Sequence, residues 1–143
     1  MFTRLEFDES GSICQFNDFP AKHFFTTMKA GNVSTRWGDA KIARDNFARC
    51  FSAHGNALSE IVSILPEHSD NIVVLPRYYT GETEKTCDGL MTSSCDTCLV
   101  LRPADCFPVL MGTIDRKFVG LIHAGWRGTD LEIARRAVEL AVK

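Results

Sequence analysis

Two segments carry the clearest information in this chain of 143 residues: RPADCFPVL at residues 102–110 and VGLIHAGWRG at residues 119–128. Each contains a run of β-branched and aliphatic residues typical of a strand, and Asp115-Arg116 between them favours a turn. If the two strands pair antiparallel, Cys106 at the start of the first lies beside His123 at the end of the second. The sequence therefore predicts that a thiol and an imidazole meet at one end of a strand pair.

Other short strands accompany this pair. Apolar and β-branched runs predict strands over 2–7, 23–27, 61–65, 71–75, 90–92, 98–101, 107–111 and 118–122, with a turn at 9–12 that leads into one more. The polar stretch 76–85 predicts a surface loop. Many strands with a few helices indicate the α/β class in its α+β form, a mixed sheet with flanking helices. The length predicts a single domain over residues 1–143.

Two helices are predicted from the hydrophobic period. The first covers 39–51 and is expected to bury Ile42, Ala43, Phe47 and Cys50. The second is expected to begin with a capping box, in which the Thr129 side chain and Glu132 satisfy each other's backbone amides. In that helix the apolar stripe is expected to contain Leu131, Ala134, Val138 and Ala141.

Composition excludes several classes of protein. The net charge is −2, whereas a nucleic-acid binder usually carries a basic surplus, so no nucleic-acid partner is expected. The first thirty residues lack the apolar core of a signal peptide, and no apolar run is long enough to cross a membrane. We therefore expect a soluble, cytoplasmic protein without a membrane partner. Its six cysteines are expected to be free thiols or metal ligands and not disulfides.

Several motifs along the chain resemble those of one known family. The two quoted segments are similar to its ADC-x-P-V-L and HAGWRG motifs, and the six-residue string HAGWRG is specific. In the same order along the chain, residues 23–34 are similar to its F-T-T-R-x-G-G-V-S loop, and DGLMT at 88–92 is similar to D-A/G-L-V-T. The chain is thus identified as a member of the YfiH-like family, also called the laccase-domain or polyphenol oxidase family. This resemblance implies a YfiH-like fold, related to that of the cytotoxic necrotizing factor deamidase.

The resemblance also implies a metal site with one cysteine and two histidines. Cys106 and His123 lie in the matching motifs, and the family's other histidine precedes a valine-rich strand. His68, within PEHSDNIVV at 66–74, fits that position, whereas His54 falls at a helix end. A thiolate and two imidazoles are good zinc ligands, and three protein ligands leave a fourth position open. We expect zinc, with copper as the alternative.

The resemblance also implies an activity: the chain would be a zinc-dependent enzyme that acts on purine nucleosides. The family's reactions are phosphorolysis to ribose 1-phosphate and free base, and adenosine deamination, which make the protein a transferase or a hydrolase. His68, Cys106 and His123 are the expected catalytic and metal-binding residues. Arg127 is expected to bind phosphate, because a guanidinium at the start of a helix suits that anion; the alternative is a solvated side chain.

Three alternative interpretations of the same residues remain. In a metal-free cysteine hydrolase, of the type that edits peptidoglycan as an amidase, Cys106 would be the nucleophile and His123 the base. Copper-dependent polyphenol oxidation employs similar ligands, but a multicopper oxidase needs many more histidines than the four present here. An inactive truncated homologue would keep the fold without activity.

The chain departs from the family pattern in two places. Where the family loop has T-T-R, this chain has Thr27-Met28-Lys29, and an ammonium cannot copy the bidentate geometry of a guanidinium. The sequence also stops at Lys143, whereas family members continue for roughly another hundred residues, an addition the size of a small domain. The expectation is therefore a C-terminally truncated version of the domain, whose exposed sheet edges favour a homo-oligomer.

Some residues have open interpretations. Asp105 either orients the neighbouring ligand or closes a turn. Trp126 is expected in the core or in a pocket wall. Cys87, Cys95 and Cys98 would form a four-thiolate zinc site with Cys106 in a less favoured alternative, because only one C-x-x-C pair is present.

Overall fold

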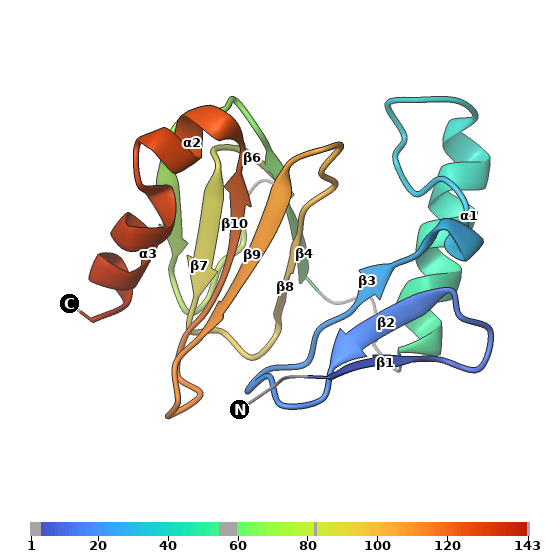
Figure 1. The fold of residues 1–143 in the computed structure, drawn as a ribbon, viewed down its shortest axis with the longest axis horizontal. Coiled ribbons are helices and arrows are strands. Elements are labelled where there is room, and N and C mark those ends of the chain that lie inside the picture. Colours follow the sequence, from blue (N-terminus) through green and yellow to red (C-terminus); the bar gives the residue numbers. More distant parts are fainter. Residues whose placement is uncertain (1–3, 55–59, 82, 143) are drawn as a thin grey trace. The chain divides into compact units, whose positions relative to one another are not determined.

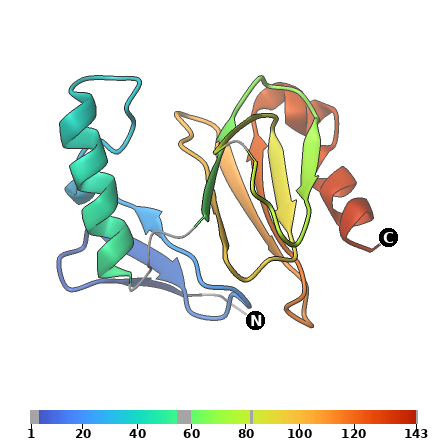
Figure 2. The same cartoon turned by 180° about the vertical axis from the view of Figure 1, so that it is seen from behind.

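The computed structural model describes residues 4–54, 60–81 and 83–142. It divides into two compact units, Met1–Leu58 and Ser59–Lys143 (Figures 1 and 2). Both units combine strands with helices, which confirms the expected α/β class. None of the helices in the described ranges has the length and apolarity that spanning a bilayer requires.

The first unit is an antiparallel sheet with one long helix. Its elements are β1 (Leu5–Phe7), β2 (Ile13–Phe16), β3 (Phe25–Thr26), the 3₁₀ helix η1 (Met28–Ala30) and α1 (Ala40–Ala53), and the sheet order is β1-β2-β3. The Asp39 carboxylate caps α1 by accepting hydrogen bonds from the amides of Lys41 and Ile42 at 2.8 and 3.0 Å. The predicted helix is thus confirmed, with its beginning one residue later.

The buried face of α1 agrees with the expected one in part. Ala43 and Cys50 are buried as predicted and Phe47 is half-buried, whereas Ile42 is exposed and Phe51 is buried in addition. Cys50 packs into a small core with Ile13 and Ala30. His54 forms the C-cap, as expected for a helix-end residue.

The second unit contains two sheets. The four-stranded sheet has the order β5-β7-β10-β9, with β5 (Ile72–Leu75), β7 (Gly89–Thr92), β10 (Val119–Ala124) and β9 (Phe107–Gly112). The three-stranded sheet has the order β6-β4-β8, with β6 (Glu84–Thr86), β4 (Glu60–Leu65) and β8 (Thr97–Val100). Parallel β5–β7 pairing beside antiparallel β7–β10 and β10–β9 pairing confirms the mixed sheet. The end of the predicted 76–85 loop is wrong, since β6 begins at Glu84; residue 82 of that loop lies outside the described residues.

Side chains alternate between two cores along the central strands of the four-stranded sheet. Leu90 and Leu121 are in the core that also contains Val62 of β4. Met91 and Ile122 are in a second core with Ile133. This period of two follows from the pleat of a strand, and it places the three-stranded sheet on one face and helix α3 on the other (Figure 1).

The C-terminal helical region is organised differently from the capping-box prediction. A short helix, α2 (Trp126–Asp130), begins after Gly125, and Thr129 lies inside it with its hydroxyl donating to the Gly125 carbonyl at 2.9 Å. Glu132 adopts a left-handed conformation (φ 57°) and precedes α3 (Ile133–Ala141) without a side-chain cap. The expected capping box is therefore wrong, because a helix already occupies the residues that were to cap one.

The predicted apolar stripe of this helix is wrong for Leu131, Ala134 and Val138, whereas Ala141 packs against the core as expected. Ile133 and Ala137 are fully buried, whereas Leu131 and Val138 are 50% and 52% exposed. The left-handed backbone at Glu132 separates α2 from α3. Helix α3 therefore turns a different set of side chains toward the sheet than a single continuous helix would.

Truncation of the two faces of α3 should have unequal effects. Ile133→Ala should lower the free energy of unfolding by about 2–5 kcal/mol, because it opens a cavity in the core, whereas Val138→Ala should lower it by about 1 kcal/mol or less. Urea unfolding of both variants followed by circular dichroism measures the difference. Equal losses would contradict the assignment of the buried face.

Candidate metal centre

Three side chains from separate parts of the second unit converge at one end of the four-stranded sheet. His68 lies in the loop between β4 and β5, Cys106 immediately precedes β9, and His123 is the penultimate residue of β10. Their ligand atoms all lie within 4.8 Å of one another. All three residues selected from the sequence are thus brought together.

The register of the β9–β10 pair produces this proximity. His123 lies opposite Pro108 and Ala124 opposite Phe107, so Cys106 comes next to the end of β10. The connection turns at Arg116, where φ is 58°, in agreement with the turn expected at Asp115-Arg116. The strand pair predicted from the sequence is confirmed, and β10 continues through His123 to Ala124.

Backbone conformation brings the other residues of the site into place. His68 itself has a positive φ of 62°, a conformation that few non-glycine residues adopt and that the surrounding contacts have to maintain. Asp105 has a φ of 68° and is exposed beside Cys106. Of its two interpretations, closing the turn before β9 is therefore the one that its conformation supports.

A buried carboxylate that was not predicted as a site residue contacts two of the three ligand residues. Asp88 precedes β7, is 0% exposed, and accepts a hydrogen bond from Nδ1 of His123 at 2.8 Å. Burial raises the pKa of its carboxyl, but hydrogen bonds from Ser69, His123 and His68 outweigh burial, so the pKa lies below its usual value. The DGLMT motif contained this residue, and an acidic side chain directly before a buried strand was the available signal.

Gly125 leaves space beside the three ligands. A Cβ atom at this position would lie 3.2 Å from Cδ2 of His68, 3.4 Å from Sγ of Cys106 and 3.5 Å from Cε1 of His123. Its φ of −74° is accessible to every residue. Glycine therefore contributes the space left by its missing side chain here, and not a special backbone conformation.

The donor set fits a catalytic type of metal site. A thiolate with two imidazoles suits zinc or copper, and three protein ligands leave a coordination position free. Nδ1 of His123 faces the Asp88 carboxylate, a contact that favours the tautomer with the proton on Nδ1 and the lone pair on Nε2. His68 is exposed, Cys106 is partly exposed and His123 is buried, so one side of the cluster is accessible to solvent.

Arg127 and Trp126 both lie at the surface of the unit. Trp126 is 74% exposed, so the expectation that it belongs to the core is wrong. The Arg127 guanidinium lies over its indole ring, 5.1 Å from the centroid. Arg127 is thus exposed two residues after Gly125, where a ligand could reach it.

The remaining cysteines do not form a second metal site. Across residues 4–54, 60–81 and 83–142, His68, Cys106 and His123 form the group of three or more ligand-type side chains close enough for an ion. All six cysteines are free thiols, as expected. Cys87 is fully buried in the core, where burial raises its pKa to about 11, and Cys95 is exposed. The four-thiolate alternative is therefore not formed by the described residues.

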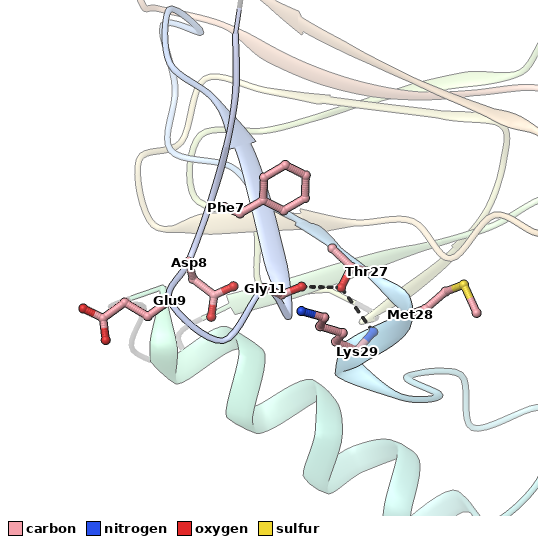
Figure 3. Close-up of a pocket in the computed structure, with 7 residues that line it drawn as sticks. All are labelled: Phe7, Asp8, Glu9, Gly11, Thr27, Met28 and Lys29. Atoms are coloured by element: carbon pink, nitrogen blue, oxygen red, sulfur yellow. Dashed lines mark hydrogen bonds between the residues drawn. The ribbon is translucent and has the colours of Figure 1, made fainter.

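The first unit has a hollow of its own at the loop that departs from the family pattern. Phe7, Asp8, Glu9, Gly11, Thr27, Met28 and Lys29 line it (Figure 3). The Thr27 hydroxyl donates to the Gly11 carbonyl at 2.6 Å, and Lys29 extends toward Gly11 while Met28 points away. Lys29, which follows Met28 in the loop where the family arginine is missing, thus lies at this hollow.

Comparison with known proteins agrees with this architecture. The family model described as "Multi-copper polyphenol oxidoreductase laccase" matches residues 23–143. The chain belongs to this family. The match spans most of the chain and includes residues of both compact units, so the resemblance recognised in the sequence is confirmed.

Two curated relatives of this laccase-domain chain bear the name purine nucleoside phosphorylase. The protein from Deinococcus radiodurans is 30% identical, with 84% of this chain and 49% of the relative covered. The protein from Xylella fastidiosa (strain Temecula1) is 38% identical, with 80% and 45% covered. The chain thus spans about half the length of these relatives.

A solved structure has the same fold. The Bacillus licheniformis hypothetical protein YfiH superposes with a TM-score of 0.64 at 28% identity, over 72% of this chain and 41% of that chain. The YfiH-like fold expected from the sequence is therefore confirmed.

The space at Gly125 can be tested with a single methyl group. Gly125→Ala should weaken metal binding roughly tenfold, because the added carbon would crowd the His68 ring at 3.2 Å and touch Cys106 and His123. Gly120→Ala is the matched control, since its Cβ would meet Cγ of Met91 at a similar 3.3 Å, away from the ligands. Chelator competition measures both affinities, and an equal loss in both variants would contradict a local effect.

Proposed function

We propose that this chain binds one zinc ion through His68, Cys106 and His123 and acts on purine nucleosides. The observation that carries this proposal is the convergence of one thiol and two imidazoles, whose ligand atoms lie within 4.8 Å of one another. Relatives named purine nucleoside phosphorylase support the choice of substrate. Copper is the alternative metal for the same donor set.

The favoured reaction is phosphorolysis. A phosphate oxygen would attack C1′ of the ribose while the bond from C1′ to the purine nitrogen breaks, and the proton of the attacking phosphate passes to that nitrogen, giving ribose 1-phosphate and the neutral free base. When bound, the metal supplies a Lewis acid at the open coordination position. Arg127 would hold the phosphate, since its guanidinium is exposed and carries several donors suited to phosphate oxygens. Adenosine deamination at the same site is the hydrolytic variant of this proposal.

The organisation of the whole protein follows from the same proposal. Residues 1–143 would act as one YfiH-like domain, although they form two compact units. Partners would be purine nucleosides and phosphate, with no nucleic acid and no membrane. We further propose a cytoplasmic location and self-association through exposed edge strands.

A metal-free cysteine hydrolase is the second candidate, and one contact favours it. Asp88, His123 and Cys106 follow the order of a catalytic triad, in which a carboxylate orients the imidazole and the imidazole activates a nucleophile. His68, which also belongs to the cluster, has no evident part in such a triad. This leaves the metal site as the better account of all three converging side chains.

Metal content distinguishes the two candidates. The wild-type protein should contain about one zinc per chain, and His68→Ala should lose it. His54→Ala serves as control, because His54 caps α1 and should leave the metal unaffected. Elemental analysis after gel filtration gives the result. A wild-type protein that takes up no zinc would overturn the site and favour Cys106 as a nucleophile.

Arg127→Ala should raise the KM for phosphate roughly tenfold or more, with a smaller effect on the KM for the nucleoside, because a charge-assisted contact to the anion is lost. Arg135→Ala is the matched control: Arg135 is an exposed arginine of α3 paired with Glu132 and Glu139. Steady-state kinetics with inosine and phosphate measures both constants. An unchanged phosphate KM would remove Arg127 from the proposed site.

A further inference from the structure

We infer that Asp88 is the positioning residue of the metal centre, because its one buried carboxylate fixes the orientation of two of the three ligands. The inference rests on the proposed function, since it concerns how the same three side chains are held for a metal. Asp88 touches neither the open coordination position nor a substrate in this account; it acts through His68 and His123.

His123 is bound to Asp88 through its side chain and through its backbone. Its Nδ1 lies 2.8 Å from Oδ1 of Asp88, and its backbone amide donates to the Asp88 carbonyl at 2.7 Å. Side chain and backbone of the histidine are thus both bound to one residue, which directly precedes the neighbouring strand β7. The carboxylate selects the tautomer with the proton on Nδ1 and leaves the Nε2 lone pair for the metal, and its negative charge makes that nitrogen a stronger donor.

The loop that carries His68 is bound to the same carboxylate. The backbone amide of His68 donates to Oδ1 of Asp88 at 3.0 Å, and Ser69 donates to Oδ2 through its amide and its hydroxyl, both at 2.8 Å. The two backbone amides hold the loop against the carboxylate, and the Ser69 hydroxyl only adds a contact to Oδ2. These hydrogen bonds explain how His68 keeps a φ of 62°, a conformation that would be unfavourable in an isolated loop.

Burial makes this arrangement sensitive to small changes. Asp88 is fully buried, so its charge depends on these donors for stabilisation, and a neutral replacement cannot satisfy all of them. In Asp88→Asn, the side-chain amide can adopt two orientations. One of them places its NH₂ group against the backbone amide of Ser69, so that two donors face each other. The other orientation turns it against the His68 amide and requires the opposite tautomer of His123.

The experiment compares Asp88→Asn and Asp88→Ala with wild type and with Ser69→Ala. Ser69→Ala removes one hydroxyl from Oδ2 and leaves the bonds of Oδ1 to His68 and His123 in place. Zinc affinity is measured by chelator competition and ligand geometry by the visible spectrum of the cobalt-substituted protein. The tautomer of His123 is read from ¹⁵N NMR of metal-free protein with neutral imidazole. Circular dichroism verifies that each variant is folded.

We expect both Asp88 variants to bind zinc roughly 10- to 100-fold more weakly with an altered cobalt spectrum, while Ser69→Ala stays close to wild type. Folded Asp88 variants with wild-type zinc affinity and cobalt spectrum would overturn the inference and leave the proposed zinc site standing. Should the variants fail to fold, the wild-type tautomer decides, because a proton on Nε2 of His123 would overturn the inference. A wild type that holds the Nδ1 proton but takes up no zinc would instead refute the proposed function.

Discussion

The antiparallel pairing of β9 with β10 is the constraint on which the second unit depends. Its register places Pro108 opposite His123, and that single alignment decides that a thiol and an imidazole share one end of the sheet. A shift of one residue would exchange the two faces of β10 and move Leu121 and Ile122 into each other's cores. Formation of the core and formation of the ligand cluster are therefore consequences of the same alignment.

The carboxylate of Asp88 links this sheet to the loop before β5. Strand β7 lies between β5 and β10, so a residue just before it is near both the His68 loop and His123. The same geometry serves a metal ligand and a general base equally well, because both need an imidazole held in one orientation. His68 distinguishes these two uses. It would be the third ligand of a metal, whereas a catalytic triad of Asp88, His123 and Cys106 has no role for it.

The sequence predicted the strand pair, the α/β class and the three converging side chains, for physical reasons that can be named. Alternation of apolar residues with a period of two is a local signal, and it sufficed for Cys106 and His123. His68 was found by resemblance, since its backbone conformation depends on contacts with a distant carboxylate. Asp88 was missed because its importance arises only from neighbours that the fold supplies. The Thr129 prediction failed because HAGWRG itself starts a short helix, which displaced the expected cap.

The separation of the ligands along the chain has a consequence for folding. His68, Cys106 and His123 are attached to three elements that meet only after the sheet has assembled. An ion held by all three would act as a cross-link between distant segments and would bind the native state far more tightly than the unfolded chain. The thermodynamic stability of this unit would then rise with the free metal concentration around it, so that the same polypeptide is robust or labile according to metal supply.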